Sequence, residues 1–331
     1  MSSSPARIGL IGCGNIWRAV YHPILDSLKG RVRITAFCDP SDSAADFTAQ
    51  LLPAAKRYAD ADTLFREEKL DAAIVLTSET ANAATALSAI RSGLAVYLEK
   101  PPATSALEWR QLTAVANGEA ASNGGQIYTA FNRRHTPLFK KWRLSPDVHL
   151  RTVRGVLHRQ GRPVETYPYT AVHLIDSVQF FSGRLLTETT CTFSEGEHGL
   201  YWKVQGYFED GAACELIFIP NSSHHSEAIV FEAMDQKWEL YFPNSPSKEH
   251  PDGLLRSRSL VQEQDIDCAR GEPEADPLEA MGHAPCFRDF LDRLENNDWE
   301  ASPHSLRQSE FTVGILEKML ESVASSQIRS C

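Results

Sequence analysis

The first part of the chain, about 130 residues, alternates between short apolar runs and longer stretches rich in alanine and leucine. The apolar runs are bounded by glycine, proline or polar residues, as buried strands are, and they cover Ile8–Ile11, Arg31–Cys38, Ala72–Leu76, Ala95–Leu98 and Gln126–Phe131. The stretches between them, such as Thr80–Ser92 and Ser105–Ala121, have helical composition. Strands that alternate with helices predict a parallel sheet covered on both faces.

The pattern changes after about residue 145. Runs with alternating or β-branched residues dominate there, among them "RTVRGVLH", "YWKVQGYF", "ACELIFI" and "KWELYF", with one helix-like stretch over Thr170–Phe181. Strands in close succession predict an antiparallel sheet, one face of which must be covered by the rest of the chain or by a second subunit. Pro243–Asp276 is expected to be irregular, whereas Pro277–Leu294 and roughly Ser305–Ser325, with Ser302 as its N-cap, are expected to be helices.

Composition narrows the class of protein. A chain of 331 residues with 42% hydrophobic and 23% charged residues fits two globular domains. Its formal net charge of −10 argues against nucleic acid or an anionic membrane as a partner, and no apolar run is long enough to span a bilayer. The 7 cysteines are scattered and contain no CxxC, so we expect a cytoplasmic protein without disulfides or metal.

The stretch "GLIGCGNIW" carries the first chemical signal. A strand, a tight glycine turn and a helix with free backbone N–H groups together form a binding site for a pyrophosphate. Gly12 suits the tight turn, Gly14 lets the backbone approach the phosphates, and the helix begins at Asn15 and Ile16. Trp17 stands where the pattern has its third glycine, which serves helix–strand packing, so either the helix shifts or the ring turns outward over the pocket.

The second predicted strand ends at Asp39, 25 residues after Gly14. A carboxylate at this place accepts hydrogen bonds from the adenosine ribose and repels a 2′-phosphate. No arginine follows directly, because the next residues are Pro40, Ser41 and Asp42. We therefore expect NAD as the cofactor, with NADP less favoured.

Three further segments carry a resemblance to a known family. "YLEKPPATS", "TAFNRRHTPLFKK" and "AVHLIDSVQFFSG", together with the glycine turn, resemble the Gfo/Idh/MocA oxidoreductases, the family of glucose–fructose oxidoreductase and myo-inositol dehydrogenase. The resemblance implies an α/β fold in three parts. These are a Rossmann domain over residues 1–132, an α/β domain over 133–302 with a large, mostly antiparallel, open-faced sheet, and a C-terminal helix over 303–331 that packs back on the Rossmann domain.

The resemblance also implies site residues. Lys100 corresponds to the active-site lysine, preceded by Glu99 and followed by a cis peptide to Pro101, and a cation there stabilises a developing alkoxide. His173 corresponds to the histidine that takes or gives the proton, since imidazole titrates near neutrality. Residues implied to line the cofactor site are Thr77, Ser78, Glu99, Lys100 and Asn132.

The chain departs from the family at two places. Many members carry D-x-G-x-H, and here Tyr169 and Ala171 replace the aspartate and the glycine. A tyrosine one turn before His173 either relays a proton, with help from Lys100, or leaves dehydrogenase activity weakened or absent. Ser78 and Asn82 likewise replace a proline and a histidine of the family's T-P-x-x-x-H.

The resemblance also implies candidate substrate contacts on the second domain. Asp176 is one helical turn after His173, and strand alternation places His158, Gln160 and Arg162 on one face. The alternatives are an ordinary helix carboxylate and polar residues at the rim, and Arg134 and Asn132 either position the cofactor or bind backbone. Arg162, if it faces the substrate, suggests a carboxylate or a phosphate on it.

Together these features predict an NAD-dependent oxidoreductase that transfers a hydride between nicotinamide and a sugar, polyol or sugar-derived acid. Two other functions stay open: an NAD-binding sensor without turnover, and an enzyme that recycles bound NAD during elimination or epimerisation. Because several aromatic residues occur in the predicted second sheet, we expect its open face to be apolar and to form a homodimer or homotetramer.

Overall fold

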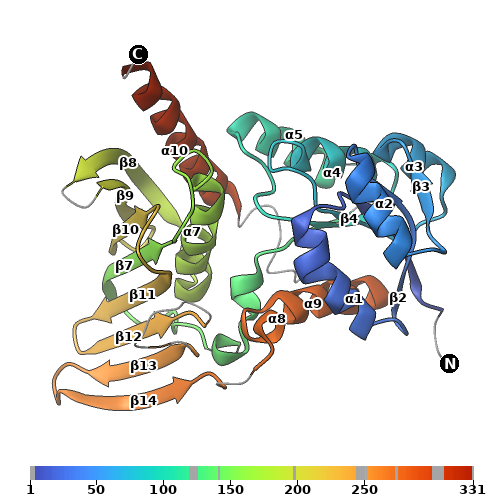
Figure 1. Cartoon of the computed structure of the whole chain (residues 1–331). Helices are drawn as coiled ribbons and strands as arrows, with labels where there is room; N and C mark the ends of the chain where they lie inside the picture. The colour runs from blue at the N-terminus through green and yellow to red at the C-terminus, as the bar shows by residue number, and fades with distance from the viewer. Residues whose placement is uncertain are drawn as a thin grey trace. The chain divides into compact units, whose positions relative to one another are not determined.

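The computed structural model describes residues 4–118, 126–140, 142–196, 199–243, 250, 252–272, 275–299 and 309–329. The chain divides into two compact units, Met1–Ala130 with Cys286–Val313, and Phe131–Pro285 with Gly314–Cys331 (Figure 1). Ser302 and the domain boundary expected between residues 302 and 303 lie outside the described residues.

The first unit is built on a parallel sheet, as the alternating pattern predicts. Its strand order is β3-β2-β1-β4-β5-β6. The strands are β1 (Ala6–Ile11), β2 (Val32–Cys38), β3 (Lys56–Tyr58), β4 (Ala72–Val75), β5 (Ala95–Leu98) and β6 (Gln126–Thr129). The pattern misses β3, because its three residues, Lys-Arg-Tyr, form no apolar run.

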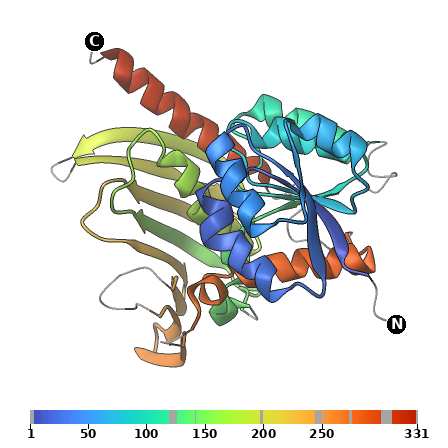
Figure 2. The same cartoon turned by 45° about the vertical axis from the view of Figure 1, so that its right-hand side comes forward.

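Helices cover both faces of this sheet (Figure 2). They are η1 (Trp17–Tyr21), α1 (His22–Ser27), α2 (Asp42–Leu51), α3 (Ala61–Glu67), α4 (Asn82–Arg91), α5 (Ala106–Ala116) and α9 (His283–Asn296). On one face, Leu64 of α3, Ile90 of α4 and Leu112 of α5 join a buried cluster with alternate strand residues. On the other, Phe287 and Phe290 of α9 contact the ring of Tyr97 edge-on, so β5 is buried from both sides.

The second unit contains a larger, mostly antiparallel sheet, which agrees with the expected fold class. Its order is β14-β13-β12-β11-β7-β10-β9-β8, and the β7–β10 pair is parallel. The strands are β7 (Leu150–His158), β8 (Leu186–Gly196), β9 (Gly199–Phe208), β10 (Ala213–Ile219), β11 (Ser226–Ala233), β12 (Gln236–Tyr241), β13 (Leu254–Ser259) and β14 (Gln264–Arg270). Its shorter helices are η2 (Asn132–His135), η3 (Pro137–Phe139) and α8 (Pro277–Ala280).

The strands β13 and β14 correct one expectation, since they lie within the stretch that we expected to be irregular. Their side chains are mostly polar, and β14 is exposed along almost its whole length at the edge of the sheet. An edge hairpin of this kind is held by backbone pairing to β12, so the apolar pattern does not reveal it.

Helix α7 (Pro168–Ser182) covers the inner face of the second sheet. Gly155 of β7 allows a close approach, because a Cβ there would lie 3.1 Å from the Leu174 side chain of α7 and 2.8 Å from that of Leu216. Helix α10 (Glu310–Arg329) joins the same core from Gly314 onward, through Ile315, Met319 and Val323.

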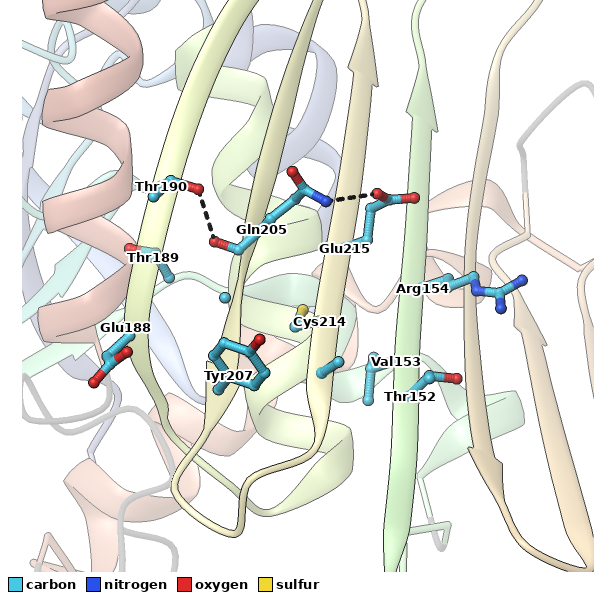
Figure 3. A pocket seen from close by; sticks show the side chains of 12 residues that line it. Thr152, Val153, Arg154, Glu188, Thr189, Thr190, Gln205, Tyr207, Cys214 and Glu215 are labelled. Atoms are coloured by element: carbon cyan, nitrogen blue, oxygen red, sulfur yellow. Dashed lines mark hydrogen bonds between the residues drawn. The ribbon is translucent and has the colours of Figure 1, made fainter.

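The outer face of the second sheet is more polar than expected. It carries a shallow hollow of about 690 Å³ over β7, β8, β9 and β10 (Figure 3). Thr190, Gln205 and Glu215 line it, and the amide of Gln205 donates to Glu215 over 3.1 Å. Tyr207 is the large ring there, and 53% of it is exposed. Successive side chains of each strand point to opposite faces of the sheet, and here the apolar ones point inward. The outer face is therefore mixed in polarity, which corrects the expectation of an apolar face.

None of the helices within the described ranges has both the length and the apolar character that crossing a membrane requires.

Candidate active site

The glycine turn between β1 and the first helix has the geometry of a phosphate-binding loop. Gly12 adopts φ +91°, and a Cβ there would lie 2.4 Å from the carbonyl oxygen of Leu76, so only glycine fits. Its N–H donates to the carbonyl of Cys38, which ties the turn to the end of β2. At Gly14 a Cβ would meet nothing within 4 Å, so the backbone borders open space where Asn15 and Ile16 start the helix. This open cradle fits the diphosphate of a dinucleotide.

Trp17 is fully buried, and the helix adapts to it. The backbone N–H of His22 bonds to the carbonyl of Trp17, five residues earlier, so Trp17–Tyr21 forms a π turn. The indole ring meets His22 edge-on at 5.4 Å between ring centroids. Of the two alternatives, the helix therefore shifts and the ring turns inward.

Asp39 is pinned beside the turn. One carboxylate oxygen accepts from the backbone N–H of Cys13 at 2.6 Å, and the other accepts from the N–H of Ser41 at 2.7 Å. Each carboxylate oxygen has a further lone pair, so the group is oriented by the chain and still able to accept from a ribose hydroxyl. This placement fits the role that its spacing predicts.

The segment Glu99–Lys100–Pro101 follows β5 directly. The Lys100–Pro101 peptide is cis, as the resemblance implies. Glu99 is 7% exposed, and its carboxylate accepts from the hydroxyl of Tyr21 at 2.5 Å and from the backbone N–H of Lys100 at 3.0 Å. Burial raises the pKa of Glu99, and the charge of Lys100 and the Tyr21 hydroxyl oppose that rise only in part. The Lys100 side chain itself is half-buried.

Asn82, the first residue of α4, holds this segment, a role that sequence reasoning missed. Its side-chain amide donates to the carbonyls of Glu99 at 3.0 Å and Pro101 at 3.1 Å, and its oxygen accepts from the hydroxyl of Thr77 at 2.9 Å. Asn82 is 1% exposed, so all these bonds are buried. The departure from T-P-x-x-x-H is the signal that could have found it.

Thr77 and Ser78 follow β4 at the same edge of the sheet as Lys100, because β4 and β5 are parallel neighbours. The carbonyl of Ser78 accepts from the N–H groups of Ala81 and Asn82 and so starts α4. The side chain of Ser78 is exposed, as an edge position for a cofactor requires.

In the second unit, α7 carries Tyr169, His173 and Asp176 at spacings of four and three residues, which place them on one helix face. The start of α7 is anchored by Tyr167, whose hydroxyl donates to the carbonyl of Leu157 and accepts from the N–H of Ile219. His173 is 8% exposed and Tyr169 is half-buried. The helix thus presents an imidazole and a phenol side by side.

Asp176 forms a buried ion pair. Both of its oxygens accept from the guanidinium of Arg134, one of them at 2.8 Å from Nε, and both side chains are 1% exposed. The rings of Phe131 and Phe180 each lie 4.9 Å from the guanidinium carbon. Burial raises the pKa of Asp176, and Arg134 offsets only part of this rise. Both carboxylate oxygens are thus already engaged, and Arg134 binds this carboxylate.

Strand β7 ends at His158, so the alternation that we expected to continue stops there. Gln160 and Arg162 follow in an exposed turn at Gly161, which has φ +65°, and they share no strand face with His158. His158 stacks on His224 at 4.4 Å, and its Nδ1 lies 3.1 Å from the hydroxyl of Ser222. Burial, His224 and Arg159 lower the pKa of His158 to about 4, so this ring is neutral near neutral pH.

Two buried groups complete the second unit. Asn132 donates to the carbonyl of Met281 at 2.8 Å and lies 3.2 Å from Nε2 of His283, so its amide binds this unit's own chain. Glu227, which sequence reasoning did not single out, accepts from Arg133 and Arg159 and is 2% exposed. Within the described part of the chain, no three His, Cys, Asp or Glu side chains cluster as metal ligands.

Comparison with known proteins shows which family the first unit resembles. A family model described as an oxidoreductase family with an NAD-binding Rossmann fold matches residues 6–122. Inositol 2-dehydrogenase 2 of Paenarthrobacter aurescens is 24% identical over 196 residues, which cover 56% of this chain and 58% of that protein. The inositol 2-dehydrogenase/D-chiro-inositol 3-dehydrogenase of Halalkalibacterium halodurans is 36% identical over 146 residues, or 43% of this chain and 40% of that protein. The matches thus span about half the length of these relatives.

Solved structures match the fold along nearly the whole chain. A dehydrogenase from Chromobacterium violaceum superposes with a TM-score of 0.81 at 14% identity, covering 99% of this chain and 98% of the other. A 3-ketoreductase from Actinomadura kijaniata, solved with NADP and TDP-benzene, has a TM-score of 0.71 at 15% identity, covering 95% and 96%. At these identities the likeness shows the fold.

Proposed function

The chain belongs to the Gfo/Idh/MocA family of oxidoreductases, and from that premise we propose that it is an NAD-dependent dehydrogenase of a sugar, polyol or sugar-derived acid. The observation that carries the proposal is the carboxyl edge of the first sheet. There the open cradle at Gly14, the pinned carboxylate of Asp39 and the Lys100 segment follow strands of one parallel sheet. Ligands of doubly wound sheets bind at this edge.

The residues divide the reaction between them. A dinucleotide held at the glycine turn by Gly12 and Gly14 would supply a nicotinamide ring as the hydride acceptor for the substrate carbon. Lys100 stabilises the negative charge that develops on the substrate oxygen, and His173 takes the hydroxyl proton, so that an alcohol becomes a carbonyl. Tyr169, one turn before His173 on α7, donates a hydrogen bond to the same substrate.

The remaining candidates hold these groups or read the substrate. The cofactor site is lined by Thr77, Ser78, Asn15 and Ile16. The hydroxyl pattern of the substrate is recognised by His158, Gln160 and Arg162. The ion pair with Arg134 supports a positioning role for Asp176 in place of substrate contact. The bond of Asn132 to the carbonyl of Met281 supports a structural role within the second unit in place of cofactor contact.

NAD is preferred to NADP in this proposal because of Asp39. Its carboxylate is oriented by two backbone N–H groups beside the turn, where a ribose binds and a 2′-phosphate would meet a negative charge. Inositol dehydrogenases among the relatives support a polyol as the substrate class.

We also propose that the protein is a cytoplasmic homodimer or homotetramer assembled through the outer face of the second sheet. The described cysteines are free, which supports a reducing compartment. The outer face carries exposed Tyr207 and charges of both signs, such as the 3.0 Å pair of Lys203 with Glu215, which suits a self-complementary contact.

The test is NAD reduction by the purified protein with a panel of inositols, aldoses and sugar acids, followed by absorbance of the reduced cofactor. Replacing Lys100 with alanine is expected to lower kcat by about 100-fold, because one charge-stabilising group at the reacting oxygen is lost. Lys29→Ala is the control, since its side chain is 75% exposed. NAD binding, measured by fluorescence, is expected to persist in both variants.

Two outcomes would replace the proposal. Binding of NAD without reduction by any substrate, and without an effect of Lys100→Ala, would indicate a protein that senses the dinucleotide. A changed substrate without net reduced cofactor would indicate that NAD is recycled during elimination or epimerisation.

A further inference from the structure

A line of buried polar groups in the first unit leads to Glu99, and the mechanism above does not use it. The hydroxyl of Tyr21 lies 3.3 Å from that of Tyr97, which lies 3.6 Å from the sulfur of Cys286. The hydroxyl of Tyr128 donates to the carboxylate of Asp289 at 2.9 Å. The three tyrosines are fully buried, in a cluster whose rings meet edge-on or stacked.

Tyr21 reaches this cluster because of the π turn. It is the last residue of the turn that begins at Trp17, and its ring meets those of Tyr97 at 5.5 Å and Phe287 at 6.2 Å. The ring is therefore held on two sides, and its hydroxyl has a defined position. That position is 2.5 Å from one oxygen of Glu99.

The second oxygen of Glu99 accepts from the backbone N–H of Lys100 at 3.0 Å. A carboxylate with one oxygen fixed by a rigid phenol can rotate little, so its other oxygen fixes the Lys100 backbone. Without the Tyr21 hydroxyl, a buried carboxylate with fewer donors favours protonation, and a protonated carboxyl is a weaker acceptor for the Lys100 N–H.

We propose that Tyr21 is a positioning residue for the reacting lysine, acting through the carboxylate of Glu99 on the backbone of Lys100. The proposal rests on the function proposed above, because it assigns Lys100 to the reaction. In this proposal the π turn that begins at Trp17 has a structural role, because it places the hydroxyl of Tyr21 against Glu99.

The experiment compares Tyr21→Phe with Tyr128→Phe. Each removes one buried hydroxyl from the same aromatic cluster, but Tyr128 donates to Asp289 and to the carbonyl of Cys286, whereas Tyr21 donates to Glu99. Tyr21→Phe is expected to lower kcat about tenfold and to change KM for NAD less than about twofold, because a small misplacement of a reacting group slows chemistry more than binding. Tyr128→Phe is expected to leave kcat within about twofold of the wild type.

A second readout does not depend on turnover. Amide hydrogen exchange of a peptide that spans residues 97–104 reports the Lys100 N–H with few others, because Pro101 and Pro102 have none. Tyr21→Phe is expected to speed exchange at Lys100, and Tyr128→Phe is not. Thermal midpoints of both variants record any general loss of stability.

The positioning role fails if exchange at Lys100 is the same in Tyr21→Phe and the wild type, or if both variants lower kcat equally. If the wild type reduces no NAD at all, the proposed function fails instead, and hydrogen exchange alone decides whether Tyr21 orders this segment.

Discussion

At the residue scale, the side chain of Asn82 forms three hydrogen bonds with groups from two segments. The segment around Lys100 offers two carbonyls, of Glu99 and Pro101, and Thr77 offers a hydroxyl. A carboxamide has two N–H donors and an acceptor oxygen, so it satisfies all three at once. A neutral histidine, with one donor and one acceptor, would leave one carbonyl without this partner. The replacement therefore strengthens the edge of the sheet where the proposed reaction occurs.

Asp39 gives a prediction on cofactor choice. Changing Asp39 to asparagine removes the negative charge but keeps one acceptor oxygen beside Cys13 and Ser41. The ratio of kcat/KM for NADP to that for NAD is expected to rise about tenfold, because a 2′-phosphate no longer meets a carboxylate.

Fluorescence titration with both dinucleotides checks this change in binding directly. Asp42→Asn, which changes a side chain 91% exposed, is the control. An unchanged ratio would mean that Asp39 holds the turn without facing the ribose.

Helix α7 illustrates what decides function at the scale of an element. Tyr167 fixes its first turn to β7 and β10, and the Arg134–Asp176 pair fixes it to η2. His173 lies between these two anchors, and the inner face around it is packed by Leu174, Ile175 and Val178. The helix is therefore rigid on both sides of the proposed proton carrier, which suits a group that must act at one place.

The buried pair predicts a large loss of stability on substitution. Asp176→Asn leaves the guanidinium of Arg134 without its counter-charge at 1% exposure, and the free energy of unfolding is expected to fall by about 3 kcal/mol. Asp210→Asn is the matched control, because Asp210 pairs with Arg184 but is 32% exposed, and a loss of about 1 kcal/mol or less is expected.

Urea unfolding of the two variants measures the difference. A cost for Asp176→Asn no greater than that for Asp210→Asn would argue that α7 does not depend on the pair. A loss of activity at unchanged stability would instead return Asp176 to the role of substrate contact.

At the scale of the whole molecule, the chain contains two units with different sheets and separate cores. The glycine turn, Asp39, Asn82 and Lys100 belong to the first, and Tyr169, His173 and Arg134 belong to the second.

Assembly is the prediction at this scale. If the outer face of the second sheet joins copies, Tyr207→Glu is expected to weaken association at least about tenfold, because it replaces the large exposed ring of the hollow with a charge. Met234→Glu is the control, since Met234 is 72% exposed in the turn between β11 and β12, away from the hollow.

Light scattering across a range of concentrations gives the mass of each variant. Equal masses for the wild type and both variants at all concentrations would remove this face as the contact.

How far the sequence predicts the site depends on how local each signal is. The glycine turn follows from Gly12 and Gly14, because the tight turn and the close approach are properties of a few adjacent residues. The second unit is less predictable. Gln160 and Arg162 were expected on a strand face, but β7 ends at His158, and β13 and β14 carry too few apolar residues to be recognised. Strand ends and edge strands depend on pairing with distant segments.

By itself the sequence determined the parallel sheet of the first unit, the antiparallel character of the second and, through resemblance, the cis peptide at Lys100–Pro101. Apolar periodicity and glycine turns are local, and they suffice for these features. Only the tertiary structure decided which groups the polar side chains bind: Tyr21 with Glu99, Asn82 with the Lys100 segment, and Arg134 with Asp176. These partners are separated by between 17 and 78 residues, and a hydrogen bond between them forms only after the packed core has brought them together.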